Sequence, residues 1–125
     1  MFFNATGFHA GSFAPAFTFR KMYPAYRLLY FCASKLEAFA GRGKNDFHAS
    51  RDLEDLIAVV DGRAELVGEI RAAASDVRSY LAKGIKKLIS IREFNDTLPG
   101  HLPPDPASQE RVGTIISRLE EIASL

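Results

Sequence analysis

The sequence has a single cysteine and almost no net charge, and both shortages exclude classes of protein. Cys32 alone allows neither an internal disulfide nor a thiolate zinc cage, which favours a reducing, cytoplasmic setting over secretion. Basic and acidic residues number 16 and 15, so no global field attracts the chain to nucleic acid or to a membrane surface. Any such binding must depend on a local cluster of charge.

Charged side chains are also absent from residues 1–19, which nevertheless hold six of the ten phenylalanines. Because glycines and a proline interrupt this stretch and no basic residue precedes Arg20, it matches neither a signal peptide nor a membrane span. We expect residues 1–16 to form an irregular aromatic segment that packs onto the helical body or onto another subunit. The alternative is the remnant of a longer domain whose upstream part is missing.

Apolar residues recur at three- and four-residue spacing over most of the remaining chain, which predicts helices. The expected helices are 25–40, one capped by Ser50 and ending near Val60, 63–73, one capped by Ser75 and Asp76, and one beginning at 106–108. Cys32 falls in the buried stripe of the first helix, as a small apolar filler. The pattern in 17–22 is β-prone and predicts one short strand. Residues 95–106, rich in proline, glycine and aspartate, predict a surface loop.

These patterns predict a mainly α fold with about five helices packed around a buried central helix, 25–40, and a short strand in front. No linker divides the chain, so residues 17–125 are expected to form one helical domain. A chain of this length buries enough surface for a core without disulfides or metals.

Lys35 lies on the shoulder of the apolar stripe of the 25–40 helix, close to Phe31. An ammonium group there must reach water past the apolar face or meet an anionic partner, so both a structural ion pair and a ligand contact are open. Asp52 and Asp55 share one flank of the next helix and are the candidate partners, although the helix dipole alone also favours acids in a first turn. Glu54 points to the opposite side, so no metal site is predicted.

Two further groups of residues carry weaker signals. Arg42 lies in a glycine-rich loop where it could meet phosphate oxygens, although the spacing is neither that of a Walker loop nor that of a dinucleotide fingerprint. A basic cluster either contacts nucleic acid or is a solvated helix face, and it comprises Lys83, Lys86, Lys87 and Arg92. The cluster gives no clear nucleic-acid site.

Several short strings together resemble the C-terminal helical half of the AbiEii-type nucleotidyltransferases. The strings are Ala-Ser-Lys-Leu-Glu-Ala-Phe at 33–39, Gly-Arg-Gly at 41–43, Ser-Arg-Asp-Leu-Glu-Asp-Leu at 50–56 and Val-Asp-Gly-Arg at 60–63. This minimal-nucleotidyltransferase-like family includes toxins of bacterial abortive-infection and toxin-antitoxin systems. The resemblance extends from about Phe17 to the end of the chain.

The resemblance implies that a nucleoside triphosphate is held with magnesium and that a nucleotidyl group passes to an acceptor such as RNA. It implies triphosphate contacts for Lys35, and it places Asp52 and Asp55 at the rim of the site. With Arg42, these residues form the candidate nucleotide-binding set. The expected partners are a nucleotide, a cognate antitoxin, or a second copy bound through the aromatic N-terminal segment, and no membrane.

One departure from the family pattern affects the expected activity. Family members carry a Gly-Ser turn and then an Asp-x-Asp-type pair that holds magnesium, whereas here Gly11 and Ser12 precede four uncharged residues and no acid occurs before Glu37. Phosphoryl transfer needs metal ions to stabilise the developing charge. We therefore expect a truncated or incomplete nucleotidyltransferase that is inactive alone. By itself it should bind nucleotide at most weakly through Lys35, and Mg²⁺ with a nucleoside triphosphate would be its cofactor only beside a complementing catalytic half. No catalytic residue is assigned, and the alternative is a non-catalytic helical interaction module.

Overall fold

The computed structural model describes residues 24–43, 47 and 50–125, without the side chains of 24–26, 42 and 43. This part is mainly α, as predicted, and contains no strand. Its helices are α2 (Pro24–Ala38), α3 (Arg51–Gly62), α4 (Leu66–Arg71), α5 (Ser75–Ile89), α6 (Arg92–Thr97) and α7 (Pro106–Ala123). The expected strand at 17–22 and the aromatic segment 1–16 lie outside the described residues.

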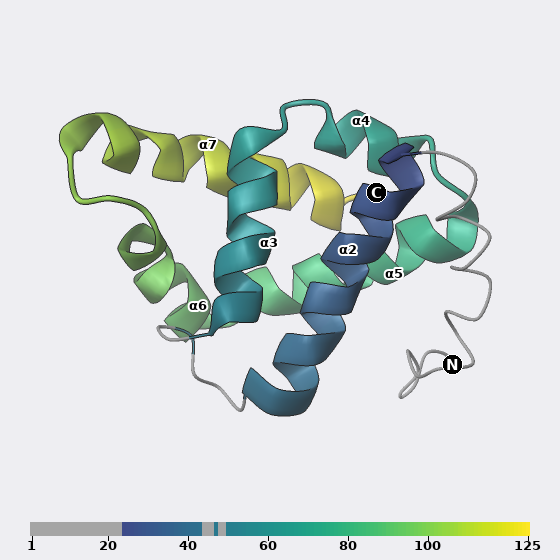
Figure 1. The fold of residues 1–125 in the computed structure, drawn as a ribbon, viewed down its shortest axis with the longest axis horizontal. Coiled ribbons are helices and arrows are strands. Elements are labelled where there is room, and N and C mark those ends of the chain that lie inside the picture. Colours follow the sequence, from purple (N-terminus) through teal and green to yellow (C-terminus); the bar gives the residue numbers. More distant parts are fainter. Residues whose placement is uncertain (1–23, 44–46, 48–49) are drawn as a thin grey trace.

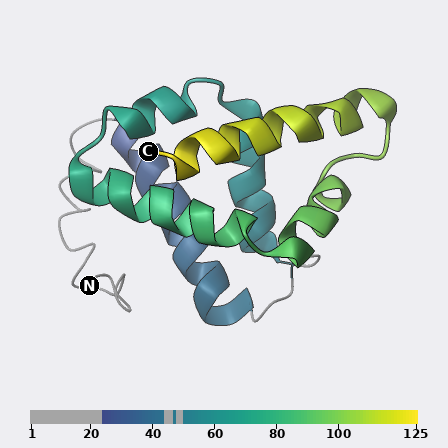
Figure 2. The same ribbon diagram turned by 180° about the vertical axis from the view of Figure 1, so that it is seen from behind.

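The longer helices form two antiparallel pairs that pack against each other. Figure 1 shows α2 and α3 side by side in front of the second pair. Figure 2 shows α5 and α7 running in opposite directions across the other face. The short helix α4 connects α3 to α5, and α6 follows the end of α5. The fold therefore presents two main faces, one made by α2 and α3 and the other by α5 and α7.

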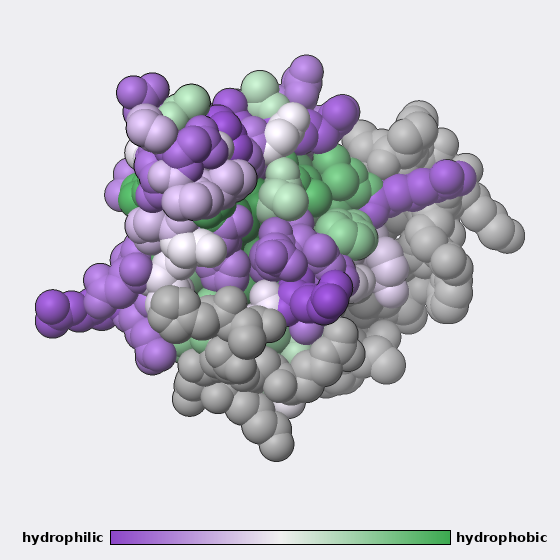
Figure 3. Space-filling view, turned by 60° about the vertical axis from the view of Figure 1, so that its left-hand side comes forward, coloured by the Kyte–Doolittle hydropathy of each residue, from purple (hydrophilic) through white to green (hydrophobic). Residues whose placement is uncertain are grey.

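One continuous hydrophobic core lies between the two pairs. The predicted central helix α2 contributes Leu29, Cys32, Ala33 and Leu36 along one side, while its Phe31 is 39% exposed. The core side chains with no exposed surface in the other helices are Leu53, Phe94 and Ile115, with Leu98 from the turn after α6 also at 0%. Figure 3 shows hydrophilic side chains over much of the described surface on the face that it presents, around a smaller apolar patch. Among the described residues, we find no helix with the length and apolar character needed to cross a bilayer.

Two predicted helix boundaries differ from the structure. Gly41 does not end the first helix, because a π-helical turn, Phe39–Gly43, continues it and keeps the buried Phe39 ring 5.2 Å from the Phe47 ring, centroid to centroid. The helix predicted for 63–73 is only α4, because Arg63 has an extended backbone and its guanidinium binds the Glu69 carboxylate. Residues 63–65, predicted to be helical, instead connect α3 to α4, and Arg63 is the C-cap of α3.

The start of α5 also differs from the prediction. Ala74 is the residue before the helix, and no side chain caps it. Ser75 is the first helical residue, and the Asp76 carboxylate accepts a hydrogen bond from the Val77 N–H at 2.8 Å. The acidic side chain thus lies inside the first turn, where the helix dipole favours it.

The surface loop predicted for 95–106 is wrong over its first half. Helix α6 and a 3-10 turn, Leu98–His101, cover it, and only 102–105 are without helical structure. The buried side chains of Phe94 and Leu98 anchor this segment in the core. Pro99 is tolerated because it lies at the start of the 3-10 turn, where a missing N–H breaks no helical hydrogen bond.

Candidate functional site

The site that the sequence predicted lies where the end of α2 meets the start of α3. Lys35 is in the last turn of α2, and Asp52 is in the first turn of α3. Ser50 caps α3 as predicted, since its hydroxyl accepts a hydrogen bond from the Leu53 N–H at 3.2 Å. Such a cap satisfies one of the free N–H groups of the helix and fixes where its first turn begins. The cap therefore determines where α3 begins, and with it the positions of Asp52 and Asp55 along the helix.

Lys35 forms ion pairs with both predicted aspartates. Its Nζ lies 2.8 Å from an Asp55 carboxylate oxygen and 3.5 Å from an Asp52 carboxylate oxygen. The Phe31 ring lies on a third side, with its centroid 5.2 Å from Nζ, within the range of a cation–π contact. We call Lys35, Asp52 and Asp55 the lysine triad.

The members of the lysine triad differ in exposure. The side chain of Asp52 is 8% exposed, that of Lys35 is 23% exposed and that of Asp55 is 44% exposed. The hydrogen bond with Asp55 contributes most to raising the pKa of Lys35, against a smaller opposing effect of burial. Lys35 therefore stays protonated, and one ammonium with two carboxylates leaves the triad with a formal charge of −1.

The remaining candidates are placed differently. The backbone of Arg42 lies in the π-helical turn after Lys35, but its side chain lies outside the described residues. Glu54 is exposed on α3, consistent with the prediction that it points away from the two aspartates. Cys32 is buried, and burial raises the pKa of its thiol to about 12, so it is no nucleophile at neutral pH.

Two contacts that hold the ends of α3 were not predicted from the sequence. Nε2 of His101 lies 2.6 Å from the Phe47 carbonyl oxygen, just before α3. At the other end, Arg118 donates hydrogen bonds to the carbonyl oxygens of Val60 and Asp61, at 2.8 and 2.9 Å. The last carbonyls of a helix have no N–H partner within the helix, so Arg118 supplies one. These pairs are more than 50 residues apart in the chain, so no local pattern reveals them.

The site offers one cation and two carboxylates as chemical groups. An ammonium can contact phosphate oxygens as a point charge. Two carboxylates alone make a weak metal site, and the described residues contain no group of three or more side chains of the types that ligate metals. A magnesium ion would therefore need further ligands from the nucleotide or from another chain.

The chain was compared with protein-family models, with curated proteins and with solved structures. None of the three comparisons found a match.

Proposed function

We propose that the chain is the helical part of an AbiEii-like nucleotidyltransferase and that it binds a magnesium complex of a nucleoside triphosphate through Lys35. Nucleotidyl transfer then requires metal-binding carboxylates, which residues 1–36 do not contain. The observation that supports the proposal is the position of the Lys35 ammonium, partly exposed between two carboxylates where α2 meets α3.

The different exposure of the aspartates suggests how a phosphate would bind. Asp55 is the more exposed partner, so a phosphate oxygen can replace it at the ammonium group while the buried Asp52 keeps Lys35 in place. An ammonium has three donor hydrogens, which allows it to contact a carboxylate and a phosphate together. Because the triad has a formal charge of −1, a bare triphosphate is repelled. Binding is therefore expected to need magnesium, which lowers the charge of the triphosphate.

Calorimetric titration with magnesium-ATP tests this proposal. We expect a binding heat for the wild type, a clear decrease of this heat in Lys35→Ala, and a smaller decrease in Lys35→Arg, which keeps the charge. Lys87→Ala is the matched control, because Lys87 is an exposed lysine on α5. Far-UV circular dichroism of each variant shows that it is folded. Equal heats for wild type and Lys35→Ala would remove the proposal.

A second candidate function rests on the uncharged aromatic segment. Six phenylalanines and no charge within residues 1–19 are typical of a surface that is covered by a partner. In that case the chain is a non-catalytic interaction module that associates through residues 1–16. Size-exclusion chromatography with and without these residues tests it: the full chain should elute as an oligomer and the shortened chain as a monomer. Two monomers would contradict the second candidate.

A further inference from the structure

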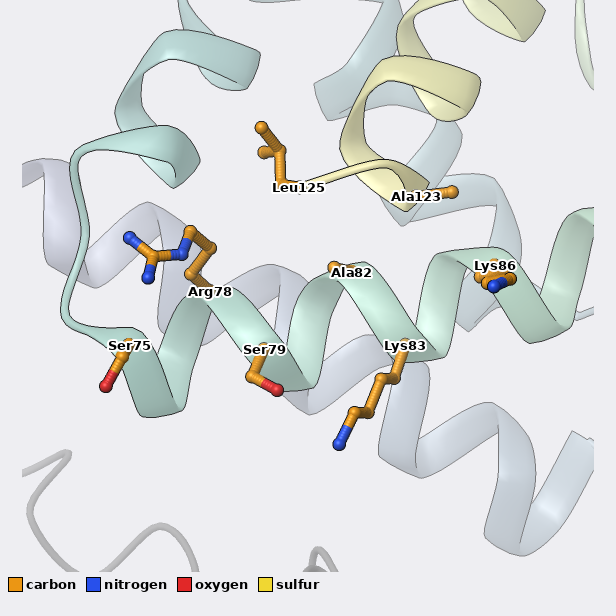
Figure 4. A pocket seen from close by; sticks show the side chains of 8 residues that line it. All are labelled: Ser75, Arg78, Ser79, Ala82, Lys83, Lys86, Ala123 and Leu125. Atoms are coloured by element: carbon orange, nitrogen blue, oxygen red, sulfur yellow. The ribbon is translucent and has the colours of Figure 1, made fainter.

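A concave surface lies on the face of the molecule opposite α2 and α3, between α5 and the end of α7. The hollow is open to solvent and has a volume of about 430 Å³. Its apolar floor includes Ala82 of α5 and Leu125 after α7. Figure 4 shows Ser75, Ser79 and Lys83 projecting to one side of α5 and Arg78 to the other, where Leu125 lies. We call this surface the α5 basin.

The polar side chains that line the α5 basin are all cations or hydroxyls. The cations are Arg78, Lys83 and Lys86, and the hydroxyls belong to two serines on the same helix face. No carboxylate side chain lines the basin, in contrast to the lysine triad, where two carboxylates already neutralise the cation. The basin therefore offers positive charge and hydrogen-bond donors that no lining side chain of opposite charge offsets.

The charge of this region is far from that of the whole chain. Residues 75–92 hold five basic side chains and one acidic one, although the complete chain has a net charge of only +1. Positive potential is therefore concentrated on α5 and on the first residue of α6. The lysines of this cluster were evident in the sequence, whereas Arg78 joins them only in the structure, where it lines the basin from the side of α5 opposite Ser75 and Lys83.

We propose that the α5 basin binds a phosphorylated small molecule of the oligophosphate class. Cationic side chains and hydroxyls are the donors that phosphate oxygens use, and the open hollow has room for a compact ligand. No aromatic residue lines the basin, so it lacks the platforms on which single-stranded nucleic acids stack their bases. The basin shares no residue with the lysine triad, and the inference stands apart from the proposed nucleotide site.

Two neighbouring lysines provide the test. Lys86 lines the basin, whereas Lys87 is exposed on the same helix but does not line it, and Lys→Met at either position removes the same charge. In calorimetric titrations with inorganic tripolyphosphate at low salt, we expect Lys86→Met to weaken binding about threefold, as for an exposed ion pair. Lys83→Met should weaken it similarly, and Lys87→Met should leave it within error of the wild type.

Three results would overturn the proposal. The first is no binding of tripolyphosphate to the wild type at millimolar concentration. The second is equal weakening by Lys86→Met and Lys87→Met, which would mean that the anion responds to the general charge of α5. The third is binding of a single-stranded oligonucleotide without binding of tripolyphosphate, which would assign the surface to a nucleic-acid chain. Loss of the Lys35-dependent heat alone would leave this proposal unaffected.

Discussion

The two carboxylates beside Lys35 have different surroundings, and their contributions to stability should differ accordingly. Asp52 is almost completely buried beside the ammonium, whereas nearly half of the Asp55 side chain is in contact with water. Water screens the charge of Asp55 and replaces its hydrogen bonds readily, although its contact with Lys35 is the shorter one. Asp55 raises the pKa of Lys35 most, but because its side chain is exposed we expect the buried Asp52 to contribute more to the stability of the fold.

Neutralising each aspartate in turn measures this difference. We expect Asp52→Asn to lower the free energy of unfolding by about 1–3 kcal/mol, because the buried carboxylate beside the Lys35 ammonium becomes a neutral amide. Asp55→Asn should lower it by less than about 1 kcal/mol. Urea denaturation followed by circular dichroism measures both. The reverse order would show that exposure does not govern the triad.

The raised pKa of Lys35 makes part of the stability depend on pH. The pKa of Lys35 in the folded chain lies above the ordinary lysine value of 10.5, chiefly because of the hydrogen bond with Asp55. The stabilisation is complete below the unfolded value and is lost as the pH rises through the folded value. Lys35→Met should therefore be less stable than the wild type at about pH 8, and this gap should narrow above about pH 11.

Other groups also titrate in the alkaline range, so the comparison must be with the variant. Burial raises the pKa of Tyr80, for example, which destabilises the folded chain at high pH in the wild type and in Lys35→Met alike. Taking the difference between the two proteins removes this shared effect. A gap that stays constant with pH would contradict the assigned role of Lys35.

At the scale of single residues, helical periodicity identified Lys35 and the two aspartates as candidate partners, and the packing of α2 against α3 brings them together. Because side chains repeat every 3.6 positions, Lys35 had to lie at the edge of the buried stripe and Asp52 had to share a flank with Asp55. The contact of His101 with Phe47 was beyond prediction, since it depends on how distant helices pack. Periodicity fixes the side of a helix on which a residue lies and leaves its long-range partner open.

Among the elements, α2 and α5 approach each other closely at Gly84. A Cβ atom built at Gly84 would lie 3.0 Å from a terminal methyl carbon of Leu36, a residue that is 7% exposed. Gly113 in α7 is a contrasting case, because nothing lies within 4 Å of a Cβ at that position. The two glycines therefore have different roles although both occur in helices.

Alanine substitutions at the two glycines separate helix propensity from packing. Gly113→Ala should raise the free energy of unfolding by about 0.5–1 kcal/mol, the usual gain in a helix interior. Gly84→Ala has the same gain in propensity but must displace the Leu36 side chain, so we expect a smaller gain or a net loss. Thermal and urea denaturation measure both variants. An equal gain at the two sites would mean that α2 moves freely away from α5.

The elements were predicted best where an apolar stripe is long. The stripes of α3, α5 and α7 located these helices, and Ser50 marked the start of α3. Helix α6 was missed because it is six residues long, too short for periodicity to be visible, and because the prolines after it indicated a loop. Short helices form here because tertiary packing compensates for weak local preference.

At the scale of the whole molecule, α6 and the 3-10 turn after it belong to the same core as the long helices. Phe94 has no exposed surface, and Leu98 in that turn is equally buried. The core is one cluster that extends from α2 to α7, so a change in any part of it should affect the unfolding of the whole domain. Cooperative unfolding follows from this continuity.

Two phenylalanines provide a matched test of this view. Phe94→Ala should lower the free energy of unfolding by about 3–5 kcal/mol, because it leaves a cavity in the core. Phe31→Ala makes the same change at a side chain that is 39% exposed, and about 1 kcal/mol is expected from the smaller burial and the lost contact with Lys35. In each variant, circular dichroism and tyrosine fluorescence should report one common transition. Similar losses in the two variants, or a transition of the long helices that Phe94→Ala leaves unchanged, would show that α6 is not part of the common core.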